Sequence, residues 1–548
     1  MEALRARFST FNDWVYSQLE KTWFPLVKDV AKERKKLEYL RMFFGFVVLD
    51  RTFTNTFGSF YFFEPDEFLV SIGLPVPKIF LYYCLSSLLV FFFMIGFLTP
   101  VTGILLALIF TPVDAMAGGR YLGNTITCMG LMMLTLNGVG QDFSVDKWLS
   151  NGKGFLSTVI KKIYNILGTP DSKQLTTVYF FAFVSYGFLN IAANLYHLQD
   201  PIWQKLYAIQ LVLTAPYLGN TPYLMRMLEQ YSIEGFHYFF ATATVLQIAY
   251  EFLIIFLVLF WKHGRKLILS WAAMFLISTT LIMLIAIVEE VTLVVYLGTL
   301  LPCRAKYFRT VEYEDGGWRS LIVKIARICD MWSLFNFIPT KSGAASQKFI
   351  SNNDLFKERK PGVASFISLL YIVLLFNYIL TFPIIQKMNF ASSLLKPLQV
   401  AFGMEIPGVY NSNDLGTPDR WPVMFRKFSD GTTEIMPWHG FEGERLEYYK
   451  FDYVFVRHGV QWRRLNGGRN AKSPQELNSP GTKSFELLKN MAVFDFRMNK
   501  SKNIIGYKVE IYQTYHTSYR LEPLDVRYTP KRVHEIEFSL QDLGLTKN

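Results

Sequence analysis

Ionisable side chains inside long apolar segments are the first candidates for chemistry in this sequence. A charge at the centre of a membrane helix costs at least ~2.5–3.5 kcal/mol on insertion scales, so each such side chain needs a partner or a cavity. The candidates are Asp50, Arg51, Asp114, Arg120, Glu251, Glu289 and Glu290. Asp114 and Arg120 flank Gly118-Gly119, where a turn at the interface and a local salt bridge are expected.

His197 is the candidate general base. It ends an apolar segment, with Asn194 three residues before it and Asp200 three residues after it. Histidine changes charge near neutral pH, so this side chain could act as a base or a ligand at the mouth of a lipid-facing pocket. The alternative is an interfacial cap in which His197 is hydrogen-bonded to Asp200.

The remaining charged candidates also have two interpretations. Arg51 could bind an acidic headgroup or pair with Glu251 beside a cavity, or it could form a structural ion pair between helices, as could Asp50. Glu289 and Glu290 would repel each other if both were ionised in a dry environment, which favours a proton or cation site. Alternatively, a turn between two short helices brings both of them to the outer interface, where they are hydrated.

Composition indicates the environment in which these groups lie. Of 548 residues, 51% are hydrophobic and 17% aromatic, whereas only 18% are charged, against roughly 25% in soluble proteins. This excludes a disordered chain, a collagen-like repeat and a soluble nucleic-acid binder. The four cysteines are scattered and no histidines show metal-ligand spacing, so neither a disulfide framework nor a metal site is predicted.

Nine apolar segments are long enough to be candidate membrane passes. They are residues 38–60, 77–98, 100–117, 121–138, 176–196, 237–262, 266–284, 286–301 and 364–385. The stretch 266–301 is too long for one straight helix, and two short passes are favoured over one pass with a re-entrant half. The predicted fold class is an α-helical polytopic membrane protein of about nine transmembrane passes with a C-terminal extracytoplasmic β-rich domain.

Basic residues predict the orientation. The segment 302–361 holds eleven Lys and Arg against six acidic residues, and the links 147–162 and 262–266 are also basic. The positive-inside rule places these segments in the cytoplasm with the N-terminus. Two passes through 266–301 satisfy the rule and leave residues 390–548 outside. That last segment has no cysteine, which favours a bacterial inner membrane over an oxidising endoplasmic lumen.

The expected organisation has five parts. Residues 1–36 form a cytoplasmic amphipathic segment, either a helix on the membrane surface or a cap packed on the protein's own loops. The other parts are a transmembrane bundle at 37–301, a basic cytoplasmic loop at 302–361, a last transmembrane helix at 362–386 and the outer domain at 390–548. In the outer domain, alternating polar and apolar residues at 507–515 predict a strand, and 450–457 and 491–497 look similar.

Several motifs resemble one membrane-protein family. The longest is Tyr186-Gly-Phe-Leu-Asn-Ile-Ala-Ala-Asn194-Leu-Tyr-His197-Leu-Gln-Asp200-Pro-Ile-Trp203. The others are the Gly, Ser and Asp residues of 136–148, the helix that follows Glu251, and Trp421-Pro-Val-Met424-Phe425. In this order they resemble the HTTM family, which includes the vitamin K-dependent γ-carboxylases. The resemblance implies a multipass bundle with an outer β domain.

The departures from the carboxylase branch concern its reactive groups. His197 stands where that branch has a lysine base, and Leu276 and Thr279 stand at or near the positions of its later histidine and asparagine. The carboxylase activity is therefore not expected here.

The sequence favours two functions. The first is a non-carboxylase relative that binds membrane lipids or a membrane-protein partner, through its outer domain or its cytoplasmic loop. The second is a membrane enzyme that acts on a lipophilic cofactor or lipid-linked substrate, with His197 as base and Glu251 as a second catalytic candidate. Arg51 and Asn194 would then contact the lipid or quinone. A transporter is the third choice because no internal repeat is visible, and nucleic acid is not an expected partner.

Overall fold

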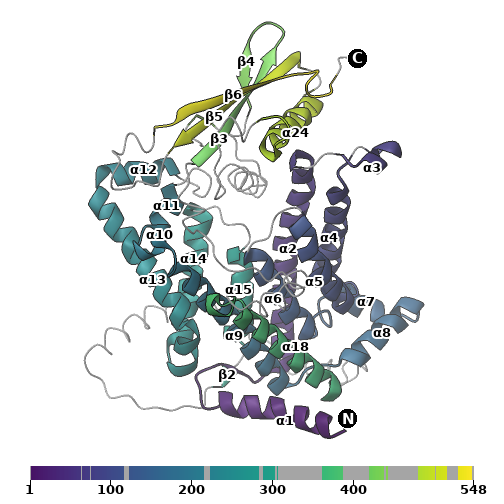
Figure 1. Cartoon of the computed structure of the whole chain (residues 1–548). Coiled ribbons are helices and arrows are strands. Elements are labelled where there is room, and N and C mark those ends of the chain that lie inside the picture. Colours follow the sequence, from purple (N-terminus) through teal and green to yellow (C-terminus); the bar gives the residue numbers. More distant parts are fainter. Residues whose placement is uncertain are drawn as a thin grey trace.

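The computed structural model describes most of the helical part of the chain and part of the C-terminal domain. The described residues are 2–62, 65–74, 76–116, 122–214, 222–282, 288–302, 305–306, 359, 361–386, 419–436, 440–441, 479–499, 502–514 and 529–545. The chain is mostly helical, with a small antiparallel sheet near its C-terminus. Helix α1 (Glu2–Leu19) and this sheet lie at opposite ends of the helical bundle (Figure 1).

Each of the nine predicted apolar segments forms a helix. These helices are α2 (Val30–Phe62), α4 (Lys78–Ile95), α5 (Thr99–Met116), α6 (Leu122–Leu136), α9 (Ser172–His197), α13 (Ile233–Phe260), α14 (Gly264–Ile282), α15 (Val288–Leu300) and α18 (Pro361–Leu380). Among the described residues, three of them (α4, α9 and α13) are long and apolar enough to cross a membrane, and α5, α6, α15 and α18 contain shorter apolar stretches. The polytopic helical class is thus compatible with the structure, and nine passes remain a prediction.

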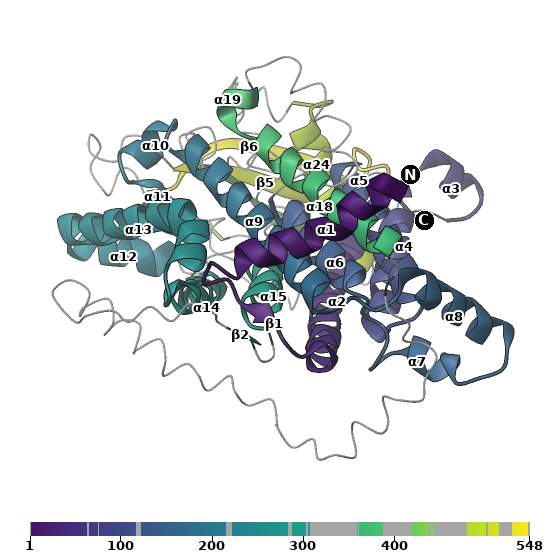
Figure 2. The same cartoon turned by 90° about the horizontal axis from the view of Figure 1, so that it is seen from below.

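Helix α9 is the centre of the bundle. In its most apolar window 78% of the residues are buried, against 33% in α4 and 28% in α13. Helices α4 and α13 lie at opposite edges of the bundle (Figures 1 and 2). There α13 exposes large apolar side chains, among them Phe239, Leu246 and Phe256. An exposed apolar surface of this kind is costly in water and suits contact with lipid.

The stretch 266–301 holds helices α14 and α15, and two passes through it remain a prediction. Helices α14 and α15 pack against each other, and residues 283–287 between them lie outside the described part. The basic side chain of Lys36 donates to the carbonyl oxygens of Leu297, Gly298 and Leu301 at the C-terminal end of α15. A cation there satisfies carbonyl groups that have no partner within the helix.

The N-terminal helix packs on the protein itself. Val15 and Leu19 of α1 are buried in the main core, and the ring of Phe11 stacks on that of Phe181 at 6.1 Å. Seen from below, α1 crosses the ends of α9 and α18 (Figure 2). This is the cap interpretation, although the cap rests on helices where loops were expected. Trp14 remains 58% exposed on its outer side.

The motif in 136–148 is a loop built around two buried carboxylates. Glu38 accepts backbone N–H groups of Gly140 at 2.6 Å and Gln141 at 2.9 Å, and it pairs with Arg41 at 2.9 Å. Gly140 has a φ of +94°, a left-handed conformation that glycine adopts without strain. The glycine lets the chain fold tightly round the Glu38 carboxylate.

The second carboxylate of this loop is Asp146. It accepts the backbone N–H groups of Leu98 and Thr99 at the start of α5, and the hydroxyl of Tyr164 donates to it at 2.8 Å. Ser144 caps helix α7 (Val145–Ser150), which is followed by α8 (Phe155–Leu167). The loop therefore joins α2, α5 and α8.

Arg359 fixes the entry to the last long helix. It is buried and donates to the carbonyl oxygens of Leu136, at the end of α6, and Leu167, at the end of α8. Burial lowers the pKa of Arg359 to about 10. The rest of the predicted basic loop, apart from the strand β2 (Ala305–Lys306) that pairs with β1 (Leu26–Val27), lies outside the described residues.

Short helices complete the bundle. They are α3 (Glu67–Ser71), α10 (Pro201–Gln204), α11 (Ala208–Thr214), α12 (Pro222–Tyr231) and α19 (Pro383–Gln386). Helices α10 to α12 connect the end of α9 with the start of α13, so they lie over one end of the α9–α13 interface.

The C-terminal domain contains a four-stranded antiparallel sheet with the order β4-β3-β5-β6. The strands are β3 (Asp419–Phe428), β4 (Thr433–Ile435), β5 (Ile504–Thr514) and β6 (Lys531–Ser539). The strand predicted near 507–515 is thus confirmed as β5. The prediction for 491–497 was wrong, because these residues belong to helix α24 (Lys483–Met498), and 450–457 lies outside the described residues.

Helix α24 can be told from a strand by the spacing of its apolar residues over a longer stretch of sequence. Leu487, Leu488, Met491 and Ala492 are buried at helical spacing, and Thr482 caps the first turn. A window of only seven residues shows an alternation that is lost over sixteen.

A buried ion pair holds α24 on the sheet. The guanidinium of Arg426 donates two hydrogen bonds to Asp495, at 2.9 and 2.7 Å, and the hydroxyl of Tyr507 donates to the same carboxylate at 2.8 Å. The hydrogen bonds to Asp495 raise the pKa of Arg426, and burial raises that of Tyr507.

Candidate functional site

The structure brings His197 and Glu251 together. His197 is the last residue of α9, and Glu251 lies in α13, 54 positions later in the sequence. Nδ1 of His197 lies 3.4 Å from Oε2 of Glu251, and the two residues are 3% and 5% exposed. The other carboxylate oxygen of Glu251 accepts a hydrogen bond of 2.9 Å from Gln247, one turn earlier in α13. A charge on His197 would therefore lie beside Glu251, and a charge on Glu251 would lie beside both His197 and Gln247.

Trp203 covers the imidazole. Its ring is stacked on that of His197, with the centroids 3.7 Å apart and the planes 10° from parallel. Trp203 is positioned by α10, which begins immediately after α9 with Asp200 as its N-cap. The carboxylate of Asp200 accepts the backbone N–H of Ile202, so the chain turns sharply and returns the indole over His197.

Asn194 is the third predicted residue that lies at this interface. It is completely buried, and its Nδ2 donates at 2.6 Å to the carbonyl oxygen of Ile248 in α13. Its Oδ1 is buried without a hydrogen-bond partner among the described residues. Asn194 therefore joins α9 to α13 one turn from His197.

A polar stripe continues from this site along α9. Tyr186, Asn190, Asn194 and His197 are spaced by four, four and three residues, so they share one face of the helix. The ring of Tyr186 meets that of Tyr296 of α15 edge-on at 5.1 Å, and the hydroxyl of Tyr296 is in hydrogen-bond contact with that of Tyr250 of α13.

Sequence reasoning missed Gln247, Tyr250 and Tyr296. The available signal was the series Thr244, Gln247 and Glu251, which places polar groups on one face of an otherwise apolar helix.

Arg51 lies elsewhere in the bundle. It is buried in α2, with its guanidinium carbon 5.2 Å from the ring centroid of Phe110 in α5. Asp50, its neighbour, is half-buried. The structure thus places Arg51 over an aromatic ring of α5, and Glu251 beside His197 and Gln247. It does not show the predicted pair between Arg51 and Glu251.

The remaining acidic and basic candidates contribute little to this site. Glu290 is in the first turn of α15, half-buried, and its Oε2 has no hydrogen-bond partner among the described residues. The side chains of Asp114, Arg120 and Glu289 lie outside the described part, so their predicted roles stay predictions.

A second group of polar side chains lies near the start of α13. Nδ1 of His237 is 3.1 Å from the amide oxygen of Gln210 in α11, and the amide nitrogen of Gln210 donates to Glu229 of α12 at 2.7 Å. The ring of Tyr207 lies 4.6 Å from that of His237. From His237 to Glu251 is fourteen residues, or about 21 Å of helix, so this group is separate from the His197 site.

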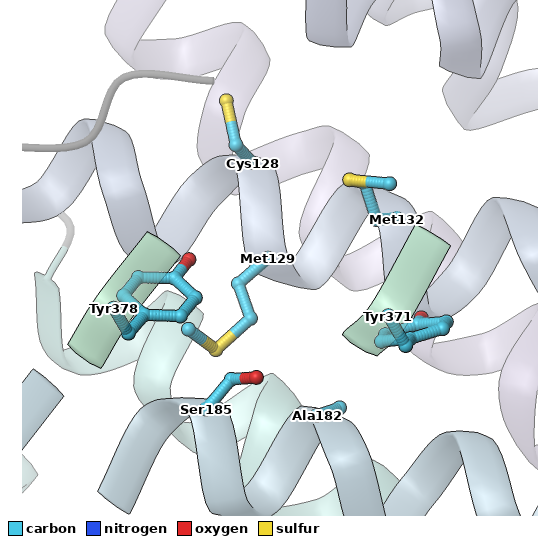
Figure 3. A pocket seen from close by; sticks show the side chains of 7 residues that line it. All are labelled: Cys128, Met129, Met132, Ala182, Ser185, Tyr371 and Tyr378. Carbon is cyan, nitrogen blue, oxygen red and sulfur yellow. The ribbon is translucent and has the colours of Figure 1, made fainter. Parts of the chain in front are cut away.

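A small cavity lies between α6, α9 and α18 (Figure 3). Its volume is about 10 Å³, close to the smallest that holds one water. It is lined by Cys128, Met129, Met132, Ala182, Ser185, Tyr371 and Tyr378. The hydroxyls of Ser185 and Tyr371 are buried without hydrogen-bond partners among the described residues, so a single water suits the space. His197 does not line it.

The arrangement at His197 can hold or pass a proton between an imidazole and a carboxylate. It offers no metal site: the described residues contain no group of three or more His, Cys, Asp or Glu side chains that could hold an ion. Comparison with protein-family models, with curated proteins and with solved structures found no match.

Proposed function

We propose that this chain is an integral membrane protein, related in architecture to the HTTM family, that acts by binding. Its helical bundle contacts membrane lipids, and its outer β-rich domain is presented to a membrane-protein partner. Three apolar helices and the exposed apolar edge of α13 support the membrane location. The positions of α1 and the sheet at opposite ends of the bundle support opposite sides of the membrane for the two (Figure 1), and the basic segments 147–162 and 302–361 favour the cytoplasm for the N-terminus.

The observation that carries the non-catalytic proposal is the covered imidazole of His197. A general base must come within about 2.6–3.2 Å of the proton that it removes. Here Trp203 is stacked on the ring, Glu251 lies beside Nδ1, and His197 is 3% exposed. The space that a lipophilic substrate would need at this base is filled by the protein's own side chains.

Labelling from two sides tests the proposed topology. In a chain whose four native cysteines are replaced by serine, Gln18→Cys and Gln541→Cys form a matched pair, because both positions are exposed, in α1 and at the end of the outer domain. In intact cells of a bacterial host, a membrane-impermeant maleimide is expected to label position 541 and to reach position 18 only after permeabilisation. Labelling of both positions in intact cells would overturn the proposed orientation.

The proposed partner is tested from the outer domain. Met498 is 70% exposed and Ile505 is 43% exposed, at the end of α24 and the start of β5. A photo-crosslinking residue at either position is expected to capture the same membrane protein, whereas one at Phe155, in the cytoplasmic part, is not. Capture from neither position 498 nor position 505, with the protein in its own membrane, would contradict presentation to a partner.

The alternative function is a membrane enzyme with His197 as base. The carboxylate of Glu251 favours it, because a carboxylate beside an imidazole orients the ring and stabilises its protonated form. For this function Trp203 must move aside to admit a lipophilic cofactor or lipid-linked substrate. Trp203→Ala separates the two proposals, because it removes the ring that covers His197. If His197 is structural, the variant is expected to bind no quinone.

A further inference from the structure

Helix α8 presents an apolar stripe that is exposed among the residues that the structure describes. Phe155 is 81% exposed and Ile166 is 56% exposed, and Trp148 of the neighbouring helix α7 is 74% exposed. Phe155, Val159 and Ile166 fall within one narrow sector of the helix, since they are separated by four and seven residues. Phe155 and Trp148 are among the most exposed aromatic side chains of the described residues.

The orientation of α8 is fixed from its other side. Ser157, Ile160 and Tyr164 are buried against the protein. The hydroxyl of Tyr164 donates to the buried carboxylate of Asp146, and Ser157 donates to the carbonyl oxygen of Gly152 at 2.7 Å. The apolar stripe therefore cannot turn inward without breaking buried hydrogen bonds.

The same surface is rich in lysine, and Asp142 lies near one of these lysines, Lys147. Lys153, Lys161 and Lys162 are exposed and Lys147 is half-buried, and no acidic residue occurs from 147 to 170. Lys162 lies one helical turn before Ile166, at the edge of the apolar stripe, and Lys161 lies further from the stripe on the same side. An amphipathic helix with apolar residues on one face and lysines beside them is typical of helices that lie in a membrane interface.

The surface faces the side of the membrane that carries the N-terminus. Hydrogen bonds hold the loop before α7 on the first turns of α2. Arg34 donates to the side chain of Gln141 at 3.0 Å, and the carboxylate of Glu38 accepts backbone N–H groups of the loop. In both views α8 projects from the bundle edge (Figures 1 and 2), and Figure 1 shows it in the half of the molecule that contains α1. It thus lies away from the C-terminal sheet, which is at the other end of the bundle (Figure 1).

We propose that α7 and α8 form a docking surface for anionic phospholipid headgroups in the leaflet on the N-terminal side. Phe155, Ile166 and Trp148 enter the boundary between headgroups and acyl chains, and the lysines pair with the phosphates. Charge complementarity selects this occupant over a neutral lipid, because Lys153, Lys161 and Lys162 are exposed on the surface and residues 147–170 contain no acidic residue. The inference rests on the proposed membrane location and deepens its lipid contact.

The test uses the full-length chain in nanodiscs, with its native cysteines replaced by serine. Ile166→Cys carries an environment-sensitive fluorophore, and Asn165→Cys is the matched control, because it is exposed on the polar side of the same helix. With phosphatidylglycerol in the disc, the label at 166 is expected to emit at shorter wavelength and to be quenched by spin-labelled lipid. The label at 165 is expected to show neither change.

Removal of charge provides the second measurement. Each lysine near an anionic membrane surface strengthens binding to that surface by roughly fivefold. Lys161→Gln combined with Lys162→Gln is therefore expected to lower the retention of phosphatidylglycerol over phosphatidylcholine by about tenfold or more. Lys205→Gln combined with Lys531→Gln, which removes two exposed charges elsewhere, is expected to leave this ratio within about twofold of the starting protein.

The outcomes separate this inference from the proposed function. If alkaline carbonate extracts the protein from membranes, the membrane proposal fails. If the protein resists extraction but the label at 166 reports water, only the lipid surface is overturned. A label that is shielded yet unaffected by lipid charge or spin-labelled lipid would also overturn it, and would indicate a protein covering α8.

Discussion

Nδ1 of His197 lies 3.4 Å from Oε2 of Glu251, inside a bundle where both side chains are almost fully removed from solvent. Removing one partner of a buried pair leaves the other without compensation and typically costs about 3–5 kcal/mol. His197→Ala is therefore expected to lower the free energy of unfolding by about that amount, measured from the unfolding midpoint in mixed micelles. His263→Ala, in the link between α13 and α14, is expected to cost less than about 1 kcal/mol.

A double-mutant cycle tests whether the two residues act as a pair. Glu251→Gln removes the charge and retains the shape, so the variant that also carries His197→Ala should lose less stability than the sum of the two single changes. Losses that add within about 0.5 kcal/mol would show that His197 and Glu251 are not coupled.

Gly140 is predicted to be intolerant of any side chain. Its φ is +94°, and an added Cβ would overlap the hydroxyls of Tyr164 and Thr99. Gly73 is the matched control, because its φ is +83° and nothing lies within 4 Å of an added Cβ. Gly73→Ala should cost only the left-handed backbone strain, about 1–2 kcal/mol, and Gly140→Ala clearly more. Equal shifts in unfolding midpoint would contradict the tight loop around Glu38.

Asp495 is expected to be the main electrostatic link between α24 and the outer sheet. Asp495→Ala leaves the buried guanidinium of Arg426 without its two shortest hydrogen bonds and should cost about 3–5 kcal/mol. Glu434 pairs with the same guanidinium at 3.0 Å but is 44% exposed, so Glu434→Ala should cost at most about 1 kcal/mol. Protease susceptibility of α24 in the full-length chain measures both, and a similar effect of the two variants would contradict this assignment.

The C-terminal domain is predicted to lose stability in acid. Burial alone would raise the pKa of Glu510, but hydrogen bonds from Lys508, Tyr512 and Arg532 outweigh it and lower the pKa below its ordinary value of 4.5. Because the folded pKa is the lower one, the stabilisation is complete above about pH 4.5 and is lost as the pH falls below that value.

Thermal unfolding of the full-length chain between pH 6 and pH 3 measures this effect. The outer-domain transition is expected to shift less with pH in Glu510→Gln than in the starting protein. An unchanged pH dependence would mean that Glu510 does not contribute.

The helical part of the fold was predictable from sequence because long apolar runs leave few alternatives to a helix. Each of the nine predicted runs lies in a helix, although α2 begins at Val30, well before the expected start. The polar residues Glu33, Arg34 and Lys36 hid that beginning. Besides the local pair of Glu33 with Lys36, their partners come from other elements of the folded protein: Tyr179 for Glu33, Gln141 for Arg34 and the end of α15 for Lys36.

The candidate site was predictable only in part. The burial cost of a charge identified Glu251, and the place of a histidine at the end of an apolar segment identified His197, but their pairing depends on how α9 crosses α13, which spacing along the chain does not determine. Trp203 was visible in the sequence as part of a motif, yet its stacking on His197 follows from the turn capped by Asp200. The helix α24 was mistaken for a strand because a short window cannot separate the two periods.

The central claim is that His197 is closed to substrates and that the protein acts by binding. The most direct measurement is mass spectrometry of the lipids, quinones and proteins that co-purify in mild detergent with the starting protein, with His197→Ala and with Glu251→Gln. If the claim is correct, all three folded proteins retain the same lipids and the same protein partner. A quinone or lipid-linked compound that is retained by the starting protein and lost from both variants would contradict it.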